Sequence, residues 1–493
     1  MTAFGLDVGT GSLKGLALSE DGRVLAVAES AYGWQTPRPG WSEQDPEQWW
    51  TAATAVLAEL TERAGSPRGI GLSGQMHGLV TLDDSDQVIR PALLWNDQRT
   101  VAEVAEIESR LGGLAGLVEQ TGNRALTGFT APKLLWMAHH EPSLHERIRS
   151  VLLPKDYVRL RLCGEHATDV TDASGTLWFD VRRREWSAPA LKALEVPETW
   201  LPDALESAVV SGSTPDRIPI AAGAGDQGAG ALGVGAVPGG RDADGRLGRA
   251  GGGRAGTISV VLGTSGVVCS PAGTYAADPL GRLQASCHAL ADAWFSMGVM
   301  LSAAGSLAWL ARASGDPTPA ALAREAAHWG PGCEGLVFLP YLTGERSPHH
   351  DPGARGAFVG LSARHDRGAL ARAVMEGVAF GLRDSLELVR SLGQPVEVGR
   401  VSGGGARSEL WLRILASALE LPLERVEVEE GAAYGAALLG GVAGGLWRDG
   451  AEAVQACVRV REVVAPDPEW VEIYAGVRER FRGLYGALRP FVA

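Results

Sequence analysis

The sequence predicts an α/β protein built from two duplicated halves around a central cleft. The chain has 493 residues, more than one hydrophobic core usually organises, so two domains are expected. Short apolar strands alternate with helices whose apolar residues recur at helical spacing. A hairpin near the N-terminus, FGLDVGTGSLK at residues 4–14, has a counterpart, SVVLGTSGV, at residues 259–267.

Both hairpins place a tight Gly-Thr turn and a serine between two apolar strands. Such a turn directs backbone N–H groups and hydroxyls toward one point, which makes an anion-binding nest. Paired nests therefore predict that a nucleotide polyphosphate binds in the cleft. Asp7, near the end of the first strand, is a hard oxygen ligand for a phosphate-bound magnesium ion. The expected phosphate-binding residues are Thr10, Gly11 and Ser12 in the first turn and Gly263, Thr264 and Ser265 in the second.

The first half continues the alternation of strands and helices. Residues 3–9, 13–19 and 24–29 are expected to form three antiparallel strands, the last two joined by the turn residues Asp21-Gly22. Asp45 followed by Pro46 predicts the start of a helix, because aspartate caps helices and proline suits their first turn. A strand near 69–73 and helices near 101–111 and 131–139 follow.

The second half repeats this plan. A long helix is expected over 367–392, capped by Asp366, and a strand at 399–402 leads into Gly403-Gly404-Gly405 and another helix. The Ala- and Gly-rich stretch 431–447 predicts a buried helix, because it falls short of the ~20 strongly apolar residues of a membrane span. Between the halves, residues 238–256 hold few apolar side chains, which predicts a flexible surface insertion; a partner-binding segment is the alternative.

Composition limits the classes of function. A net charge of −13 argues against a nucleic-acid or anionic-membrane surface, since both need basic stripes. Five scattered cysteines without a C-x-x-C pair indicate reduced thiols in a cytoplasm. No signal peptide is expected, because a strand begins within the first residues.

Asp226 is the strongest candidate for chemistry. It is the one charged residue in AGAGDQGAGALGVGAV, residues 222–237, where a loop enters a helix. A helix N-terminus favours an ionised carboxylate, so Asp226 is expected to be unprotonated at neutral pH and able to accept a hydroxyl proton. The alternative is an N-cap with no further role. Two phosphate nests in the same chain favour the base.

Two further motifs predict contacts to a polyol. In SGQMHG, residues 73–78, His77 is suited to donate to a sugar hydroxyl and Met76 to pack on its carbon face; a structural histidine is the alternative. The run LWNDQR, residues 94–99, brings together an aromatic, an amide, a carboxylate and a guanidinium, namely Trp95, Asn96, Asp97 and Arg99, which suit a wall of sugar-hydroxyl contacts. The alternative is a helix start capped by Asp97.

Two further motifs lie in the second half of the chain. Gly404 and Gly405, between a strand and a helix, would let a purine and ribose approach the backbone. The neighbours Glu345 and Arg346 suggest an internal ion pair.

Longer stretches resemble a known family. WSEQDPEQWW at 41–50, GQMHG at 74–78, LWND at 94–97, GFTAPKLLWMAHH at 128–140, LPKDY at 153–157 and residues 356–376 are similar to the carbohydrate kinases of the FGGY family, and within it to the xylulose kinases. The resemblance runs nearly end to end. It implies an actin- and hexokinase-like (ribonuclease H-like) fold. It assigns sugar binding to residues 1–237 and nucleotide binding to residues 257–493.

The resemblance also implies a reaction, the ATP- and Mg²⁺-dependent phosphorylation of the C5 hydroxyl of D-xylulose. Asp226 matches the proton acceptor, Asp7 the magnesium carboxylate, and Met76-His77 the ketose site. Gln227 stands where the family usually has asparagine, next to the substrate's far hydroxyls. A homodimer is compatible with the resemblance. The alternatives are a kinase for ribulose or an alditol and, from another class, a catalytically silent sugar sensor or an actin-like scaffold.

Overall fold

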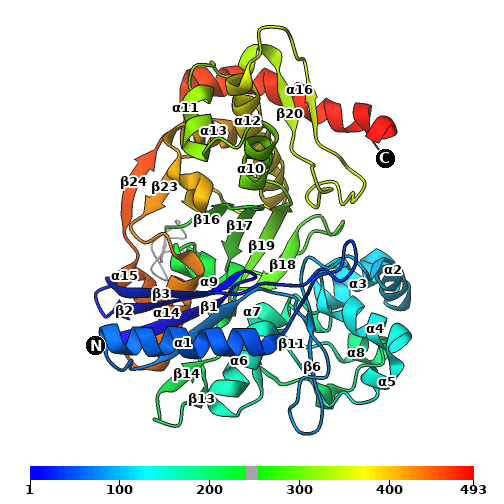
Figure 1. Ribbon diagram of the computed structural model, residues 1–493, viewed down its shortest axis with the longest axis vertical. Coiled ribbons are helices and arrows are strands. Elements are labelled where there is room, and N and C mark those ends of the chain that lie inside the picture. Colours follow the sequence, from blue (N-terminus) through cyan, green and yellow to red (C-terminus); the bar gives the residue numbers. More distant parts are fainter. Residues whose placement is uncertain (240–253, 493) are drawn as a thin grey trace. The chain divides into compact units, whose positions relative to one another are not determined.

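The computed structural model describes residues 1–239 and 254–492, and its contacts divide the chain into two compact units (Figure 1). Unit 1 comprises Met1–Arg254, Pro271–Phe295 and Glu430–Val458, and unit 2 comprises Ala255–Ser270, Ser296–Glu429 and Arg459–Ala493. Each unit therefore contains segments that are distant in sequence. Most of the predicted insertion at 238–256 lies outside the described residues.

A mixed sheet organises unit 1. Its strand order is β13-β14-β5-β1-β2-β3, and β15 also pairs with β5. β1 pairs antiparallel with β2 and parallel with β5. The three predicted N-terminal strands are confirmed. The strands are β1 (Thr2–Val8), β2 (Ser12–Ser19), β3 (Val24–Ala31), β5 (Ile70–Gly74), β13 (Val210–Ser213), β14 (Pro219–Ala221) and β15 (Ala224–Gly225).

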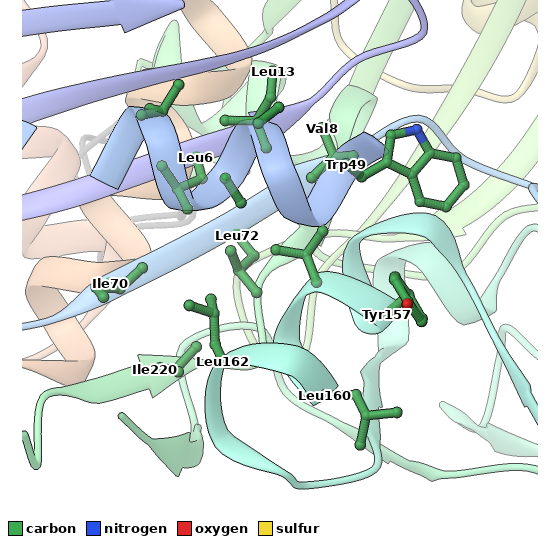
Figure 2. Close-up of a cluster of buried hydrophobic side chains, with 14 of the residues drawn as sticks. Leu6, Val8, Leu13, Trp49, Ile70, Leu72, Tyr157, Leu160, Leu162 and Ile220 are labelled. Carbon is green, nitrogen blue, oxygen red and sulfur yellow. The ribbon is translucent and has the colours of Figure 1, made fainter. Parts of the chain in front are cut away.

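Helix α1 (Pro46–Ala64) covers one face of this sheet, with most contacts to β2 and β3. Asp45 caps it as predicted, because its carboxylate accepts the N–H of Glu47 at 3.0 Å. The buried side chains of α1, including Trp49, pack with apolar residues of the sheet and of α6 (Pro154–Cys163) (Figure 2). Burial of this cluster stabilises the packing of α1 and α6 on the sheet by roughly 25 cal/mol per Å² of apolar surface.

Helix α14 (Gly431–Ala443) packs on the opposite face, against β1, β5 and α9 (Asp226–Gly233). The helix lies so close that a Cβ on Gly5 would come within 2.1 Å of the Ala433 carbonyl oxygen, and one on Gly71 within 1.8 Å of that of Ala436. The small residues of 430–441 therefore pack backbone against backbone. The predicted buried helix is confirmed, and no helix among the described residues is long and apolar enough to cross a membrane.

Shorter elements complete unit 1. They are β4 (Glu43–Gln44), β6 (Val80–Leu82), β7 (Ala92–Leu93), α2 (Val101–Arg110), α3 (Gly113–Thr121), α4 (Thr130–His140), α5 (Pro142–His145), β8 (Ser150–Leu152), β9 (Ala167–Asp169), α7 (Val170–Ala173), β10 (Phe179–Asp180), β11 (Glu185–Trp186), α8 (Ala188–Ala193), η1 (Glu198–Trp200), β12 (Asp203–Leu205), β18 (Gln284–Cys287) and α15 (Gly450–Cys457).

Unit 2 repeats the core pattern of unit 1. Its sheet runs β19-β17-β16-β22-β23-β24, and β16 pairs antiparallel with β17 and parallel with β22, as β1 does with β2 and β5. The predicted duplicated α/β architecture is thereby confirmed. The strands are β16 (Thr257–Leu262), β17 (Gly266–Ala272), β19 (Trp294–Met300), β22 (Val398–Ser402), β23 (Leu423–Val426) and β24 (Val460–Val464).

The long helix α12 (Arg367–Ser391) is the main helix of unit 2, and Asp366 caps it as predicted by accepting the N–H of Ala369 at 2.9 Å. It packs on α11 and α13. The other elements of unit 2 are α10 (Ala304–Ala313), α11 (Pro319–Ala326), η3 (Cys333–Gly335), β20 (Val337–Leu339), β21 (Ala357–Val359), η4 (Gly404–Arg407), α13 (Glu409–Leu419) and α16 (Pro468–Val492).

Candidate active site

The turn between β1 and β2 is fixed by side chains from four other segments. The Gln75 side chain accepts the Thr10 hydroxyl at 3.2 Å, and the Gln44 side-chain amide donates to the Thr10 carbonyl at 3.0 Å. The Tyr32 hydroxyl donates to the Gly9 carbonyl at 2.7 Å, and the Trp95 indole donates to the Thr10 hydroxyl at 3.0 Å. The turn is thus preformed.

Two of the predicted turn residues have differing environments. Gly11 is exposed. The Ser12 hydroxyl donates to the Glu29 carboxylate of β3 at 2.6 Å, so this side chain is engaged within the sheet.

Asp7 lies in β1, directly beside Ser73 of β5, whose hydroxyl donates to its carboxylate at 3.0 Å. Burial raises the pKa of Asp7, because a charged carboxylate loses hydration there; the Ser73 bond and the charge of Lys14 act in the opposite direction. The carboxylate therefore lacks a full counter-charge.

Asp226 is the first residue of α9 and follows β15, which pairs with β5 at Ala224–Ser73 and Gly225–Gly74. This pairing brings Asp226 to the same end of the sheet as Asp7. The pKa of Asp226 is raised to about 7, first by burial and then by the negative charge of Asp7. The expectation that Asp226 is unprotonated at neutral pH is therefore correct only in part, because a group with this pKa is about half ionised there: desolvation and a like charge oppose the helix dipole.

Gln227 lies directly against this carboxylate. Its backbone N–H and its side-chain amide both hydrogen-bond Asp226, which opposes the rise in the pKa of Asp226. The residue that departs from the family pattern thus contacts the predicted proton acceptor.

Met76 and His77 are both buried. Met76 packs on Gly225, where an added Cβ would lie 2.7 Å from the methionine Cγ. The His77 Nδ1 lies 3.0 Å from the Gly175 carbonyl oxygen, so Nδ1 carries the proton. Nε2 is then an acceptor in a neutral ring and a donor in a charged one, so a hydrogen bond from His77 to a sugar hydroxyl stays a prediction.

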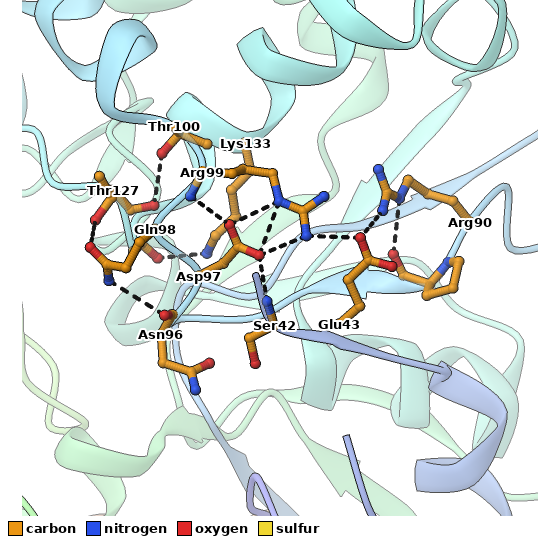
Figure 3. Close-up of polar contacts among 12 residues, drawn as sticks. Ser42, Glu43, Arg90, Asn96, Asp97, Gln98, Arg99, Thr100, Thr127 and Lys133 are labelled. Carbon is orange, nitrogen blue, oxygen red and sulfur yellow. Dashed lines mark hydrogen bonds and ion pairs between the residues drawn. The ribbon is translucent and has the colours of Figure 1, made fainter. Parts of the chain in front are cut away.

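The segment after β7 contains a buried ion-pair cluster (Figure 3). Asp97 is fully buried and pairs with Arg99 at 2.7 Å, and it accepts the N–H of Ser42 at 2.7 Å. Glu43 pairs with the same Arg99 at 2.8 Å. Asp97 caps no helix, because α2 begins at Val101 after Thr100. The prediction that Asp97 caps a helix is therefore wrong, because its carboxylate pairs with the buried guanidinium of Arg99.

Asn96 differs from its neighbour, and Figure 3 shows its side chain pointing away from the Asp97–Arg99 pair. Its Oδ1 has no hydrogen-bond partner in the described part of the chain. A buried acceptor of this kind is normally satisfied, and a sugar hydroxyl has the chemistry to do so.

Unit 2 contains a pocket of about 1370 Å³, large enough for a nucleotide-sized ligand. Four of the predicted nucleotide-binding residues line it: Gly263, Thr264, Gly404 and Gly405. Ser265 is partly buried and is not among the lining residues. The pairing of β16 with β22 thus brings together two predicted glycine motifs that lie about 140 positions apart in the sequence.

The wall of this pocket explains why its glycines are needed. Gly403 has φ +90°, and a Cβ on Gly405 would lie 2.5 Å from the Leu262 side chain. Gly404 faces open space. The lining also includes Trp309, which stacks on Phe338 at 6.2 Å, and the cationic residues Arg312, Arg324 and Arg407. Aromatic and cationic groups suit a base and its phosphates.

Sequence reasoning missed several residues. Gln44, Gln75 and Trp95 lie in quoted motifs, but only the structure shows that they hold the Thr10 turn. Gln44 lies in the polar stretch SEQDPE and Gln75 between Gly74 and Met76, so no local pattern singled out either side chain. Trp309 carried no signal either, because an aromatic at helical spacing usually indicates core.

The predicted Glu345–Arg346 ion pair is absent from the described residues. Instead, the Glu345 carboxylate accepts the backbone N–H groups of Leu301 at 2.9 Å and Arg346 at 2.8 Å. Burial raises the pKa of Glu345 to about 8. Both N–H groups donate to Oε1, and Oε2 has no hydrogen-bond partner among the described residues. The positive charge of Arg346 opposes the rise in the pKa of Glu345 without forming a direct ion pair.

The carboxylates of unit 1 fit a magnesium ion better than a metal held only by protein. Within residues 1–239 and 254–492, no group of three or more His, Cys, Asp or Glu side chains is arranged to hold a metal ion. Magnesium in phosphoryl-transfer sites needs only one or two carboxylates besides the phosphates. Asp7 and Asp226 both have raised pKa values, as expected where a cation would compensate their charge.

Two linked α/β units, one with a carboxylate pair beside a rigid turn and the other with a glycine-walled pocket, define a protein class that uses a nucleotide. Comparison with protein families is more specific: residues 2–233 and 258–444 match the N- and C-terminal domains of the FGGY family of carbohydrate kinases. The chain belongs to this family.

Individual relatives agree with this assignment. The chain is 38% identical to the xylulose kinase of Escherichia coli, over 99% of this chain and 100% of the relative. The crystal structure of a xyloylose kinase from Brucella ovis has a TM-score of 0.90 at 38% identity, covering 99% and 100% of the two chains. That of a xylulose kinase from Rhodospirillum rubrum has a TM-score of 0.88 at 32% identity, with full coverage of both.

Proposed function

We propose that this carbohydrate kinase transfers the γ-phosphoryl group of ATP to the C5 hydroxyl of D-xylulose. The observation that carries the proposal is 38% identity to a xylulose kinase over essentially the whole of both chains. The site supports it, because a carboxylate with a pKa of about 7 is well matched to accept a hydroxyl proton near neutral pH.

In this proposal the chemistry is divided between the units. Asp226 accepts the proton of the attacking hydroxyl, and Asp7 holds Mg²⁺, directly or through water. When bound, Mg²⁺ would neutralise charge on the phosphates. The sugar is bound by Met76, His77, Asn96 and Gln227. The nucleotide is bound by Thr10, Gly11, Ser12, Gly263, Thr264, Ser265, Gly404 and Gly405.

Residues 1–237 are accordingly proposed as the sugar-binding domain and residues 257–493 as the nucleotide-binding domain. A cytoplasmic location and a homodimeric state are part of the same proposal. Size-exclusion chromatography with light scattering measures the oligomeric state.

The substrate is tested by ADP release with a panel of acceptors, namely D-xylulose, D-ribulose, xylitol and glycerol, each with ATP and MgCl₂. D-xylulose is expected to have the highest kcat/KM, with its phosphate at C5 by NMR. Because a pocket separates such neighbours by one or two hydrogen bonds, the panel discriminates where residue patterns do not. A higher kcat/KM for another acceptor would show that D-xylulose is not the preferred substrate, while the kinase activity would stand. No ADP release with any acceptor would contradict the kinase activity itself.

A further inference from the structure

The segment directly before Asp226, residues 222–225, is attached to a buried polar network. The network consists of Lys155, Asp156 and Arg159 of α6 together with Asp169 and Thr171, and all five side chains are fully or almost fully buried. Asp169 lies at the start of α7 and accepts the N–H groups of Thr171 and Asp172. Its other oxygen pairs with Lys155 Nζ at 2.6 Å.

Both ends of the segment before Asp226 are attached to this network. The Arg159 guanidinium donates to the Ala222 carbonyl at one end. At the other end, the Gly225 N–H donates to the Thr171 hydroxyl at 2.7 Å. Gly225 is the residue directly before Asp226. The two contacts therefore determine where α9 begins.

The Thr171 hydroxyl is itself held in one orientation. It donates to the Asp169 carboxylate at 2.6 Å while accepting from Gly225. A hydroxyl with one donor hydrogen, already committed to a carboxylate, can meet Gly225 only as an acceptor. The Thr171 methyl side also packs on α9, because a Cβ on Gly228 would lie 3.2 Å from Thr171 Cβ and 3.3 Å from its Cγ2.

We infer that Thr171 is a positioning residue for phosphoryl transfer: its hydroxyl, oriented by Asp169 and Lys155, fixes the first turn of α9 and so the place of the Asp226 carboxylate. This inference rests on the proposed role of Asp226 as proton acceptor. Thr171 acts through Gly225, and nothing assigns it to the chemical step. Since misplacing a reacting group by about 1 Å can cost on the order of 100-fold in rate, a fixed attachment at this point matters for turnover.

The test compares two threonines of the same segment. Thr171→Val keeps the shape but removes the hydroxyl, leaving the buried Gly225 N–H without its acceptor. Thr168→Val makes the same chemical change three residues earlier, at a buried threonine whose hydroxyl has no hydrogen-bond partner among the described residues. Thr171→Ser retains the hydroxyl. Each variant is measured for kcat, for KM of D-xylulose and of ATP, and for melting temperature.

Thr171→Val is expected to lower kcat by on the order of 10- to 100-fold while both KM values change by less than about threefold. Thr171→Ser should restore kcat to within about threefold of the parent enzyme, and Thr168→Val should leave it unchanged. A merely structural role would lower the melting temperature without this split between kcat and KM.

Should Thr171→Val fail to fold, Gly228→Ala perturbs the contact between Thr171 and α9 from the side of the helix. The added methyl group displaces Thr171 by a few tenths of an ångström, and alanine suits a helix. A reduced kcat supports the inference; an unchanged kcat overturns it.

Asp226→Asn separates the positioning role of Thr171 from the proposed role of Asp226 as proton acceptor. If Asp226→Asn is inactive and Thr171→Val retains the parent kcat, the positioning role is wrong and the proposed function stands. If Asp226→Asn retains full activity, the proposed acceptor fails, and the inference fails with it.

Discussion

Asp226 contains a carboxyl group whose proton affinity is set by its neighbours. Burial and the Asp7 charge raise its pKa, while the hydrogen bonds from Gln227 lower it, and the result is a pKa of about 7. Two carboxylates that share one site separate in proton affinity in this way. A cation at Asp7 would remove part of the repulsion and so lower the pKa of Asp226. In the proposed reaction, bound Mg²⁺ would thus favour the ionised form of Asp226.

This pKa predicts a pH dependence. In the proposed reaction the ionised carboxylate accepts the proton, so kcat/KM for the sugar should rise with pH and then level off. Without a cation the pKa of Asp226 is about 7, and bound Mg²⁺ lowers it, so the levelling should fall below pH 7, with a tenfold loss per pH unit well below the lowered pKa. Steady-state rates between about pH 5 and 9 at saturating ATP and Mg²⁺ measure the profile. The residual activity of Asp226→Asn should lack this limb. A parent profile that stays level down to pH 5 would contradict the assignment.

Asp97 and Arg99 illustrate a second kind of buried charge, one that supports structure. Replacing Asp97 by asparagine leaves the Arg99 guanidinium buried, with only Glu43 to pair with it. The expected loss in free energy of unfolding is about 3 kcal/mol, because the buried guanidinium loses one of its two carboxylate partners. Urea denaturation of Asp97→Asn measures it.

Asp84→Asn is the matched control, because Asp84 is exposed. It should change the free energy of unfolding by less than about 0.5 kcal/mol. Equal effects of the two changes would show that the pair in Figure 3 contributes little.

At the scale of elements, the contact of α14 with β1 and β5 depends on glycine. Gly71→Ala would place a methyl group 1.8 Å from the Ala436 carbonyl oxygen, and neither backbone can yield without moving the helix. We expect a loss of more than about 3 kcal/mol in the free energy of unfolding, or insoluble protein. Chemical denaturation measures it.

Gly483→Ala is the matched control, and it is expected to change the free energy of unfolding in the opposite direction. Gly483 lies in α16, with open space around the added carbon. Alanine in a helix interior should stabilise the protein by about 0.5–1 kcal/mol. A Gly71→Ala variant as stable as the parent would show that the helix does not lie this close.

Elements whose cause is local were predictable from the sequence. The N-terminal hairpin follows from its short apolar strands and turn residues, and α1 and α12 follow from their caps Asp45 and Asp366. The site was predictable in part. Repeated hairpins identified the turns, and the Asp226 segment was visible as a lone charge among glycines.

The features that were missed depend on contacts between distant segments. The pKa of Asp226 depends on Asp7, which is 219 positions away in the sequence. The attachment of Gly225 to Thr171 joins residues 54 apart. A local pattern cannot report desolvation or a partner brought near by folding, and so the dipole argument placed the pKa of Asp226 too low.

For the whole molecule, the division into two units predicts that nucleotide and sugar binding can be separated by mutation. Gly404 lines the unit 2 pocket, and nothing lies near the place of an added Cβ. Gly404→Val should therefore raise the KM for ATP by about tenfold, with the KM for sugar and the melting temperature little changed, because the side chain fills space meant for the nucleotide.

Gly405→Ala serves as the comparison, because its Cβ would collide with Leu262 at 2.5 Å. This change should lower the melting temperature itself. An unchanged KM for ATP in Gly404→Val would remove this pocket as the nucleotide site.

The central claim is that Asp226 accepts the proton of the sugar hydroxyl, and Asp226→Asn tests it most directly. The assay combines kcat on D-xylulose with ATP affinity by calorimetry. The account predicts that kcat falls by on the order of 10²- to 10⁴-fold while ATP binds as in the parent protein. Turnover close to that of the parent enzyme, in a variant with normal ATP affinity, would contradict it.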